Sequence, residues 1–96
     1  MNTDFDPIDL AMLVRGWVAG AAPRDELSID RAEQLQRVAV LLQQLYTEID
    51  EDEWDRVWAY EVAAPLGQWI GERFVAARQM PSMEDVERAA RGLIAD

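Results

Sequence analysis

The chain has 96 residues and a net charge of −10, with nineteen acidic side chains against nine basic ones. All nine bases are arginines, and lysine, histidine and cysteine are absent. These absences exclude a disulfide framework, a thiol nucleophile, a cysteine- or histidine-based zinc site, a Schiff-base lysine and a P-loop lysine. Half of the residues are apolar, which is typical of a folded protein, and the length predicts one domain over residues 1–96.

The first predicted helix begins at Asp6 and has Pro7 at its first helical position, where a missing N–H costs no hydrogen bond. From Ile8 to Val18 apolar residues cover more than half of its surface. This pattern is typical of a helix that is buried on several sides, in a core or in a subunit interface. Gly20 and the Ala-Ala-Pro that follows it are expected to end the helix.

The second predicted helix runs from Ser28 to Thr47 and carries apolar residues at alternating intervals of three and four, the period of a coiled-coil seam. The members of this stripe are Leu35, Val38, Leu42, Leu45 and Ile49. One interpretation is an ordinary bundle helix that packs inside its own chain, and the other is a homodimer seam. Two heptads are too few to decide between them.

The third predicted helix begins with a capping box formed by Asp50 and Glu53. Its apolar face continues past Pro65, where a missing N–H and a clash with the preceding turn predict a kink or a break. The continuation Leu66–Met80 is expected to form a fourth segment.

Ser82 is expected to cap a last helix, with Asp85 at its third position. No segment alternates apolar and polar residues in the way a strand does. The sequence therefore predicts an all-α bundle of four to five helices without a sheet.

Two pairs of glycines have a spacing that puts both members on one face of a helix. Gly16 and Gly20 form the first pair, and Gly67 and Gly71 form the second. In lipid this spacing marks helix dimerisation, whereas in other proteins it more often just permits close packing.

The negative charge is concentrated in two short runs of the sequence. Residues 1–14 carry −3 and residues 48–61 carry −6, whereas residues 15–47 are neutral and residues 62–96 carry −1. Both acidic runs lie at predicted helix starts, where carboxylates interact favourably with the helix dipole. Five acids within positions 50–55 exceed what one helix end needs, because they repel one another.

The second acidic run surrounds two tryptophans, and an aromatic centre within a charged rim is typical of a binding hot spot. The candidate partner-binding residues are Glu48, Asp50, Glu51, Asp52, Glu53, Trp54, Asp55, Trp58 and Glu61. The alternative is that the carboxylates only cap the helix and aid solubility, while the tryptophans belong to the core.

The same residues match a calcium-binding loop only in part. An EF-hand loop that begins at Asp50 would place Asp52 and Glu61 at ligand positions. Its sharp turn would then need glycine where the sequence has Asp55, and Trp54 would occupy a ligand position. We therefore expect no calcium site here, and no other metal or cofactor.

These observations favour a non-enzymatic interaction protein over an enzyme. Ser28 and Ser82 are the only serines, and the chain has no histidine or lysine to activate either of them. The acidic run would bind a basic protein surface, such as that of a nucleic-acid-binding protein, but not nucleic acid itself or an anionic membrane. With no basic signal sequence and no long apolar segment, a cytoplasmic protein is expected.

Small acidic proteins of this kind resemble, as a class, the phage- and plasmid-encoded inhibitors of restriction or CRISPR systems. That resemblance implies a nucleic-acid mimic that occupies a basic channel. The alternative functions are a helical homodimeric scaffold, which would use the stripe of the second helix or the first helix, and an immunity or antitoxin-like subunit. In the scaffold and the subunit the acids would serve only capping and solubility.

Overall fold

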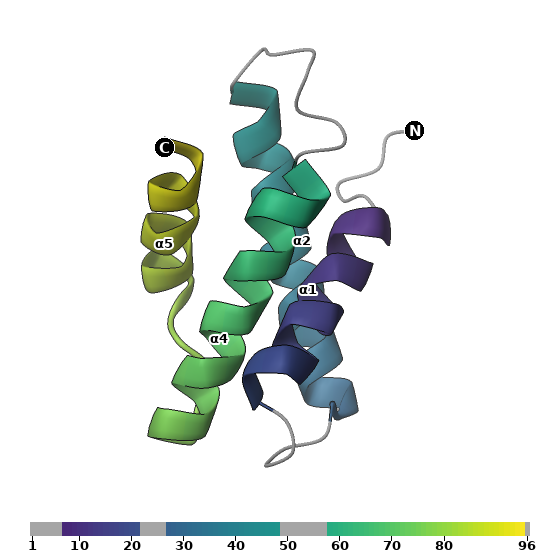
Figure 1. Ribbon diagram of the computed structural model, residues 1–96, viewed down its shortest axis with the longest axis vertical. Coiled ribbons are helices and arrows are strands. Elements are labelled where there is room, and N and C mark those ends of the chain that lie inside the picture. The colour runs from purple at the N-terminus through teal and green to yellow at the C-terminus, as the bar shows by residue number, and fades with distance from the viewer. Residues whose placement is uncertain (1–6, 22–26, 49–57, 96) are drawn as a thin grey trace.

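A computed structural model describes residues 7–21, 27–48 and 58–95 (Figure 1). The helices are α1 (Pro7–Ala21), α2 (Ile29–Glu48), the π-helical segment η1 (Trp58–Ala63), α4 (Ala64–Ala77) and α5 (Met83–Ala95). Because these residues include no strand, the all-α bundle predicted from the sequence is confirmed. Within the same residues, no helix combines the length and the apolar character needed to span a bilayer.

Serine hydroxyls cap α2 and α5, and the cap at Ser82 is the one that the sequence predicts. The Ser28 hydroxyl accepts a hydrogen bond from the Arg31 N–H at 3.3 Å, and the Ser82 hydroxyl accepts one from the Asp85 N–H at 3.2 Å. In each case the donor lies three residues into the helix, where the backbone N–H has no partner inside the helix. The predicted start of α5 after Ser82 is also confirmed, and Pro7 is helical as predicted, whereas Asp6 lies outside the described residues.

The kink or break predicted at Pro65 is not shown by the structure. Ala63 keeps helical backbone angles, with φ −66° and ψ −47°, and Pro65 lies in the first turn of α4. What changes is the winding, which is π-helical up to Ala63 and α-helical from Ala64. A proline is tolerated in a first helical turn because the N–H of that position needs no partner inside the new winding.

The end of α4 also differs from the prediction. The helix was expected to reach Met80, but it ends at Ala77 because Arg78 adopts the left-handed conformation with φ 62°. The Arg78 N–H bonds to the Phe74 carbonyl oxygen at 2.6 Å, which closes the last turn.

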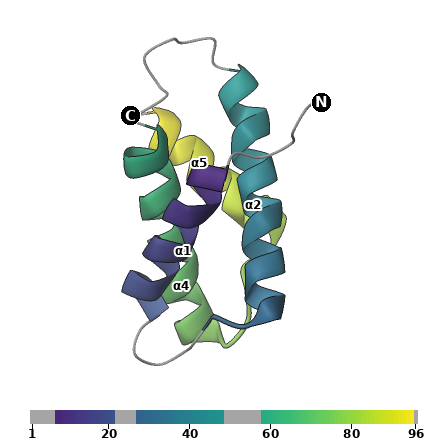
Figure 2. The same cartoon turned by 90° about the vertical axis from the view of Figure 1, so that its right-hand side faces the viewer.

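Two of the helices run parallel to each other in direct contact. In Figure 1, α1 and α4 run in one direction, and α2 and α5 run in the opposite direction. Figure 2 shows α1 and α4 together on one side, with α2 on the other. The radius of gyration is 12.5 Å, which is what a compact chain of this length is expected to have.

Backbone-to-backbone contact between α1 and α4 depends on all four paired glycines. A Cβ atom at Gly16 would lie 2.6 Å from the Gln68 nitrogen, and one at Gly71 would lie 2.9 Å from the Trp17 oxygen. A Cβ at Gly67 would lie 2.9 Å from the Leu13 Cα. Real Cβ atoms are not found this close to backbone, so the two helix axes can approach only because these positions lack a side chain.

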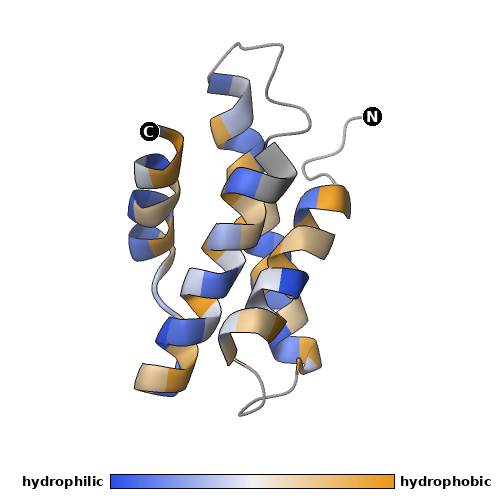
Figure 3. Cartoon of the chain, viewed as in Figure 1, coloured by the Kyte–Doolittle hydropathy of each residue, from blue (hydrophilic) through white to orange (hydrophobic). Residues whose placement is uncertain are grey.

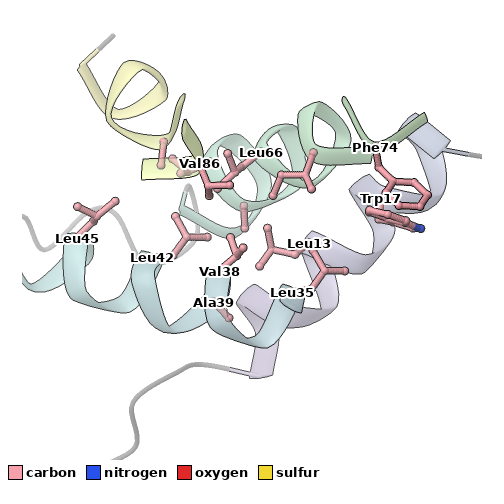
Figure 4. Packing of buried hydrophobic residues seen from close by; sticks show 14 of the residues in the cluster. Leu13, Trp17, Leu35, Val38, Ala39, Leu42, Leu45, Leu66, Phe74 and Val86 are labelled. Carbon is pink, nitrogen blue, oxygen red and sulfur yellow. The ribbon is translucent and has the colours of Figure 1, made fainter. Parts of the chain in front are cut away.

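The core is formed by side chains from all four α-helices and from η1 (Figure 4). Its buried hydrophobic residues are Leu13, Trp17, Ala21, Leu35, Val38, Ala39, Leu42, Leu45, Val62, Ala63, Leu66, Ile70, Phe74, Val86 and Ala90. Trp17 packs on Phe74 with ring centres 5.0 Å apart, and the Arg31 guanidinium lies 4.2 Å from the centre of the same Phe74 ring. Trp17 and Phe74 lie side by side in Figure 4.

The apolar stripe of α2 belongs to this core. Leu35, Val38, Leu42 and Leu45 are at most 2% exposed, and they pack against helices of the same chain. Ile49, the fifth member, lies outside the described residues. Packing inside one chain therefore accounts for the stripe, and a homodimer through it would have to compete with the core for the same four side chains.

The close approach of α1 and α4 predicts opposite effects for two Gly→Ala substitutions. Gly67→Ala should lower the free energy of unfolding by about 1–3 kcal/mol, because the added methyl meets the backbone of α1. Gly92→Ala is the control, because a Cβ at this exposed position of α5 meets nothing within 4 Å. It should raise the free energy of unfolding by about 0.5–1 kcal/mol. Urea unfolding measures both, and equal effects would contradict the packing described.

Candidate partner-binding site

The fold brings the borders of both acidic runs to one end of the bundle. In Figure 1, α1 begins, α2 ends and η1 begins at the same end, which we call the acidic end. Residues 1–6 lead into α1, and residues 49–57 connect α2 to η1. The two runs are far apart in sequence, but the described residues that border them lie at the same end of the bundle.

Of the nine candidate residues, only some lie in the described part of the chain. Glu48 at the end of α2 and Glu61 in η1 are both exposed. Trp58 is the first residue of η1, and only its backbone is described. Asp50, Glu51, Asp52, Glu53, Trp54 and Asp55 lie outside the described residues, as does the capping box predicted from Asp50 and Glu53.

Glu48 takes part in an exposed ion-pair network between α2 and α5. The Arg91 Nη1 atom lies 3.4 Å from the Glu48 carboxylate, and its Nη2 lies 2.9 Å from that of Glu87. The hydrogen bond to Glu87 raises the pKa of Arg91 above its ordinary value, and the charge of Glu48 adds to this effect. Arg91 therefore offsets part of the negative charge at the border of the acidic end.

One acid of the first run is not on the surface. Asp9 is only 2% exposed, and the Gln43 Nε2 of α2 donates a hydrogen bond to its Oδ2. The charge count of the sequence could not show this burial. The spacing of Asp9, Leu13 and Trp17 is a signal that could have revealed it, because residues four apart share one helix face and the other two are core residues.

The described surface contains several grooves. The one between α4 and α5 has a volume of about 420 Å³ and is lined by Trp69, Arg73, Pro81, Asp85, Arg88 and Ala89. The Arg73 guanidinium lies over the Trp69 ring, 5.2 Å from its centre. Within residues 7–21, 27–48 and 58–95, no three acids are grouped closely enough to hold a metal ion.

Comparison with models of known protein families, with curated protein sequences and with solved structures finds no match to this chain. The chemistry and placement of its own residues therefore provide the basis for a proposed function.

The buried contact of Asp9 predicts that Gln43 stabilises the fold. Gln43→Met should lower the free energy of unfolding by about 1.5–3 kcal/mol, because a buried carboxylate loses a hydrogen-bond donor. Gln44→Met at the exposed neighbouring position is the matched control and should change it by less than about 0.5 kcal/mol. Chemical unfolding of both variants tests this, and equal stability of the two would show that the contact contributes nothing.

Proposed function

We propose that the protein is a non-enzymatic interaction module whose acidic end binds a basic surface on another protein. The observation that supports this proposal most is that the helix ends bordering the two acidic runs lie at one end of the bundle (Figure 1). The runs carry −3 and −6 of a total charge of −10. Almost all of the net charge therefore belongs to segments that border one end.

This placement matters because salt limits the range of electrostatic forces. The Debye length is about 8 Å at physiological ionic strength. The molecule is 37 Å long along its longest axis, so charges at its two ends act independently on a partner. Charges that share one end act together, and they can attract a basic surface and increase its rate of association.

The partner we propose is the basic surface of a nucleic-acid-handling protein. Such surfaces are built to neutralise a row of phosphates. A compact acidic end can occupy them in place of nucleic acid, which is how an inhibitor of the anti-restriction or anti-CRISPR type would act. Glu61 is exposed at the border of this end, and so is Glu48, which also pairs with Arg91.

The alternative is a scaffold or an immunity-like subunit in which the acids serve only capping and solubility. Two observations indicate that some of the acids have such a structural role. Glu48 is already paired with Arg91, and Asp9 is buried against Gln43. The alternative predicts that moving negative charge from one end of the molecule to the other would leave partner binding unchanged.

Two triple variants of equal net charge separate these proposals. The first replaces Glu51, Asp52 and Glu53 with arginine. The control replaces Asp30, Glu33 and Glu84, exposed residues in the early turns of α2 and α5, of which α2 begins at the opposite end (Figure 1). Proteins captured from the native host by the wild-type chain should be lost with the first variant and kept with the control.

The same capture should weaken as salt is raised, because the contact is electrostatic. Capture that survives the first variant would refute the role of the acidic end. Capture lost equally with both variants would show that only total charge matters. Circular dichroism of each variant checks that its helices are retained.

The proposal that the acidic end takes the place of nucleic acid makes a separate prediction. Duplex DNA or RNA should release the captured partner from the wild-type chain, because both would occupy the same basic surface. The chain itself should not retard labelled nucleic acid in a gel. A ternary complex of chain, partner and nucleic acid would contradict mimicry while leaving the acidic contact possible.

A further inference from the structure

Helix α1 leaves an apolar side open to solvent. Ile8 is 59% exposed and Val18 is 51% exposed, and both are aliphatic residues of this helix. The only charged residues between Pro7 and Ala21 are Asp9, which is buried, and Arg15. In Figure 3 most of α1 has the colours of apolar residues, whereas α5 shows extended hydrophilic patches.

The open side is a continuous face of the helix. Its exposed residues are Ile8, Ala11, Arg15, Val18 and Ala19. They follow the three- and four-residue spacing that puts side chains on one side of a helix. The other sides of α1 are occupied, because Gly16 and Gly20 contact α4, and Leu13 and Trp17 lie in the core. A helix that is apolar on all sides is normally covered on all sides.

The face continues onto α4 through a groove of about 290 Å³. This groove is lined by Arg15, Gly16, Ala19, Ala64, Pro65 and Gln68. Glu72 is exposed one turn after Gln68, and it accepts a hydrogen bond from the Gln68 Nε2 at 3.3 Å. We call the open side of α1, together with Pro65, Gln68 and Glu72, the α1 flank.

We infer that the α1 flank binds the α1 flank of a second copy of this chain. The first argument is charge. Two chains of net charge −10 repel each other unless they meet where carboxylates are not opposed. Residues 10–24 contain no acid, and α1 presents mainly apolar groups along its exposed side. On this face two copies can approach with little repulsion at the point of contact.

The second argument is self-complementarity. In a two-fold dimer the same patch meets itself, so a charged residue must find its opposite on the same patch. Arg15 forms no salt bridge with any residue in the described ranges, and neither does Glu72. Both lie on the α1 flank. Arg15 of each copy is therefore available to pair with Glu72 of the other, at the edge of an apolar centre.

The size of the flank sets the strength of the dimer. A helix of 15 residues is about 22 Å long. A seam based on one such helix per copy is smaller than the roughly 800 Å² per partner of a standard interface. We therefore expect a weak dimer, monomeric at about 1 µM and dimeric at several hundred micromolar, a range typical of small interfaces.

Sedimentation equilibrium over this concentration range tests the inference. Val18→Glu should weaken the dimer at least tenfold, because it places a charge in the apolar centre of the flank. Gln36→Glu adds the same charge at an exposed position of α2 and should leave the dimer unchanged. A wild-type chain that stays monomeric throughout, or a dimer that is equally stable with Val18→Glu, would overturn the proposal.

Exchanging the charges of Arg15 and Glu72 by substitution tests their pairing more specifically than Val18→Glu does. Glu72→Arg alone makes the chain less negative, so a dimer limited by general repulsion would become stronger. Our proposal predicts that it becomes weaker, because Arg15 then meets an arginine. The double variant Arg15→Glu with Glu72→Arg should restore the dimer. Failure of the double variant to exceed both single variants would refute this pairing, provided that circular dichroism shows each variant to be helical.

This inference does not depend on the acidic end. The variants that test it leave residues 48–61 unchanged, and the triple variant of the acidic end leaves the α1 flank unchanged. A chain that is monomeric but captures a basic partner refutes only the dimer, and a dimer that captures none refutes only the proposed function.

Discussion

The contact on which the rest of the structure depends is the approach of two parallel helix backbones, α1 and α4. Four glycines make it possible, two on each helix. Parallel neighbours are not what short connections produce, because a short loop returns the chain in the opposite direction. Here the chain makes a full excursion through α2 before it returns as η1 and α4 beside α1 (Figures 1 and 2). Removing side chains from the contact lets dispersion forces act between the backbones themselves.

The position of α1 in the fold follows from this contact. Its glycine side is used by α4, and a second side inserts Leu13 and Trp17 into the core beneath α2. No described helix covers the third side, although four of its five exposed residues are apolar. The sequence pattern of α1 predicts burial on several sides, and a single chain supplies only part of that burial. A second copy is the occupant that the charge of the molecule favours for the remaining side.

Local signals predicted the helices well, whereas the contacts between helices could not be predicted. Ser28, Ser82 and Pro7 mark helix starts because their effects act within one turn of the backbone, which the sequence shows directly. At Pro65 the proline alone predicts a kink or a break. The winding instead changes from π to α at Ala64, so that Pro65 lies in the first turn of α4. Arg78 in the left-handed conformation carries no sequence signal, since glycine is the residue expected there.

For the candidate site, too, the sequence predicted local features but not how they are arranged in space. Periodicity and charge counts identified an acidic run around Trp54 and Trp58, but they gave no reason for the described borders of the two runs to lie at the same end of the bundle. They also could not separate Asp9, which is buried, from acids at the surface. The glycine pairs were visible, but two pairs can match in more than one way, and only the packed structure shows that Gly16 lies beside Gln68 and Gly71 beside Trp17.

The parallel contact also explains why the helix ends that border the acidic runs lie at one end of the bundle. Residues 1–6 of the first run precede α1, and residues 49–57 of the second precede η1 and α4, so parallel packing of α1 with α4 brings both helix starts to the same end. The positive ends of two helix dipoles then lie close together, which is unfavourable unless negative charge is nearby. Carboxylates at this end relieve that repulsion, and this accounts for some of them.

Two helix starts carry only about one positive charge in total, whereas the runs carry −9, so a large negative excess remains. The capping function and the binding function thus have one structural origin, and the excess is the part that a partner would have to neutralise.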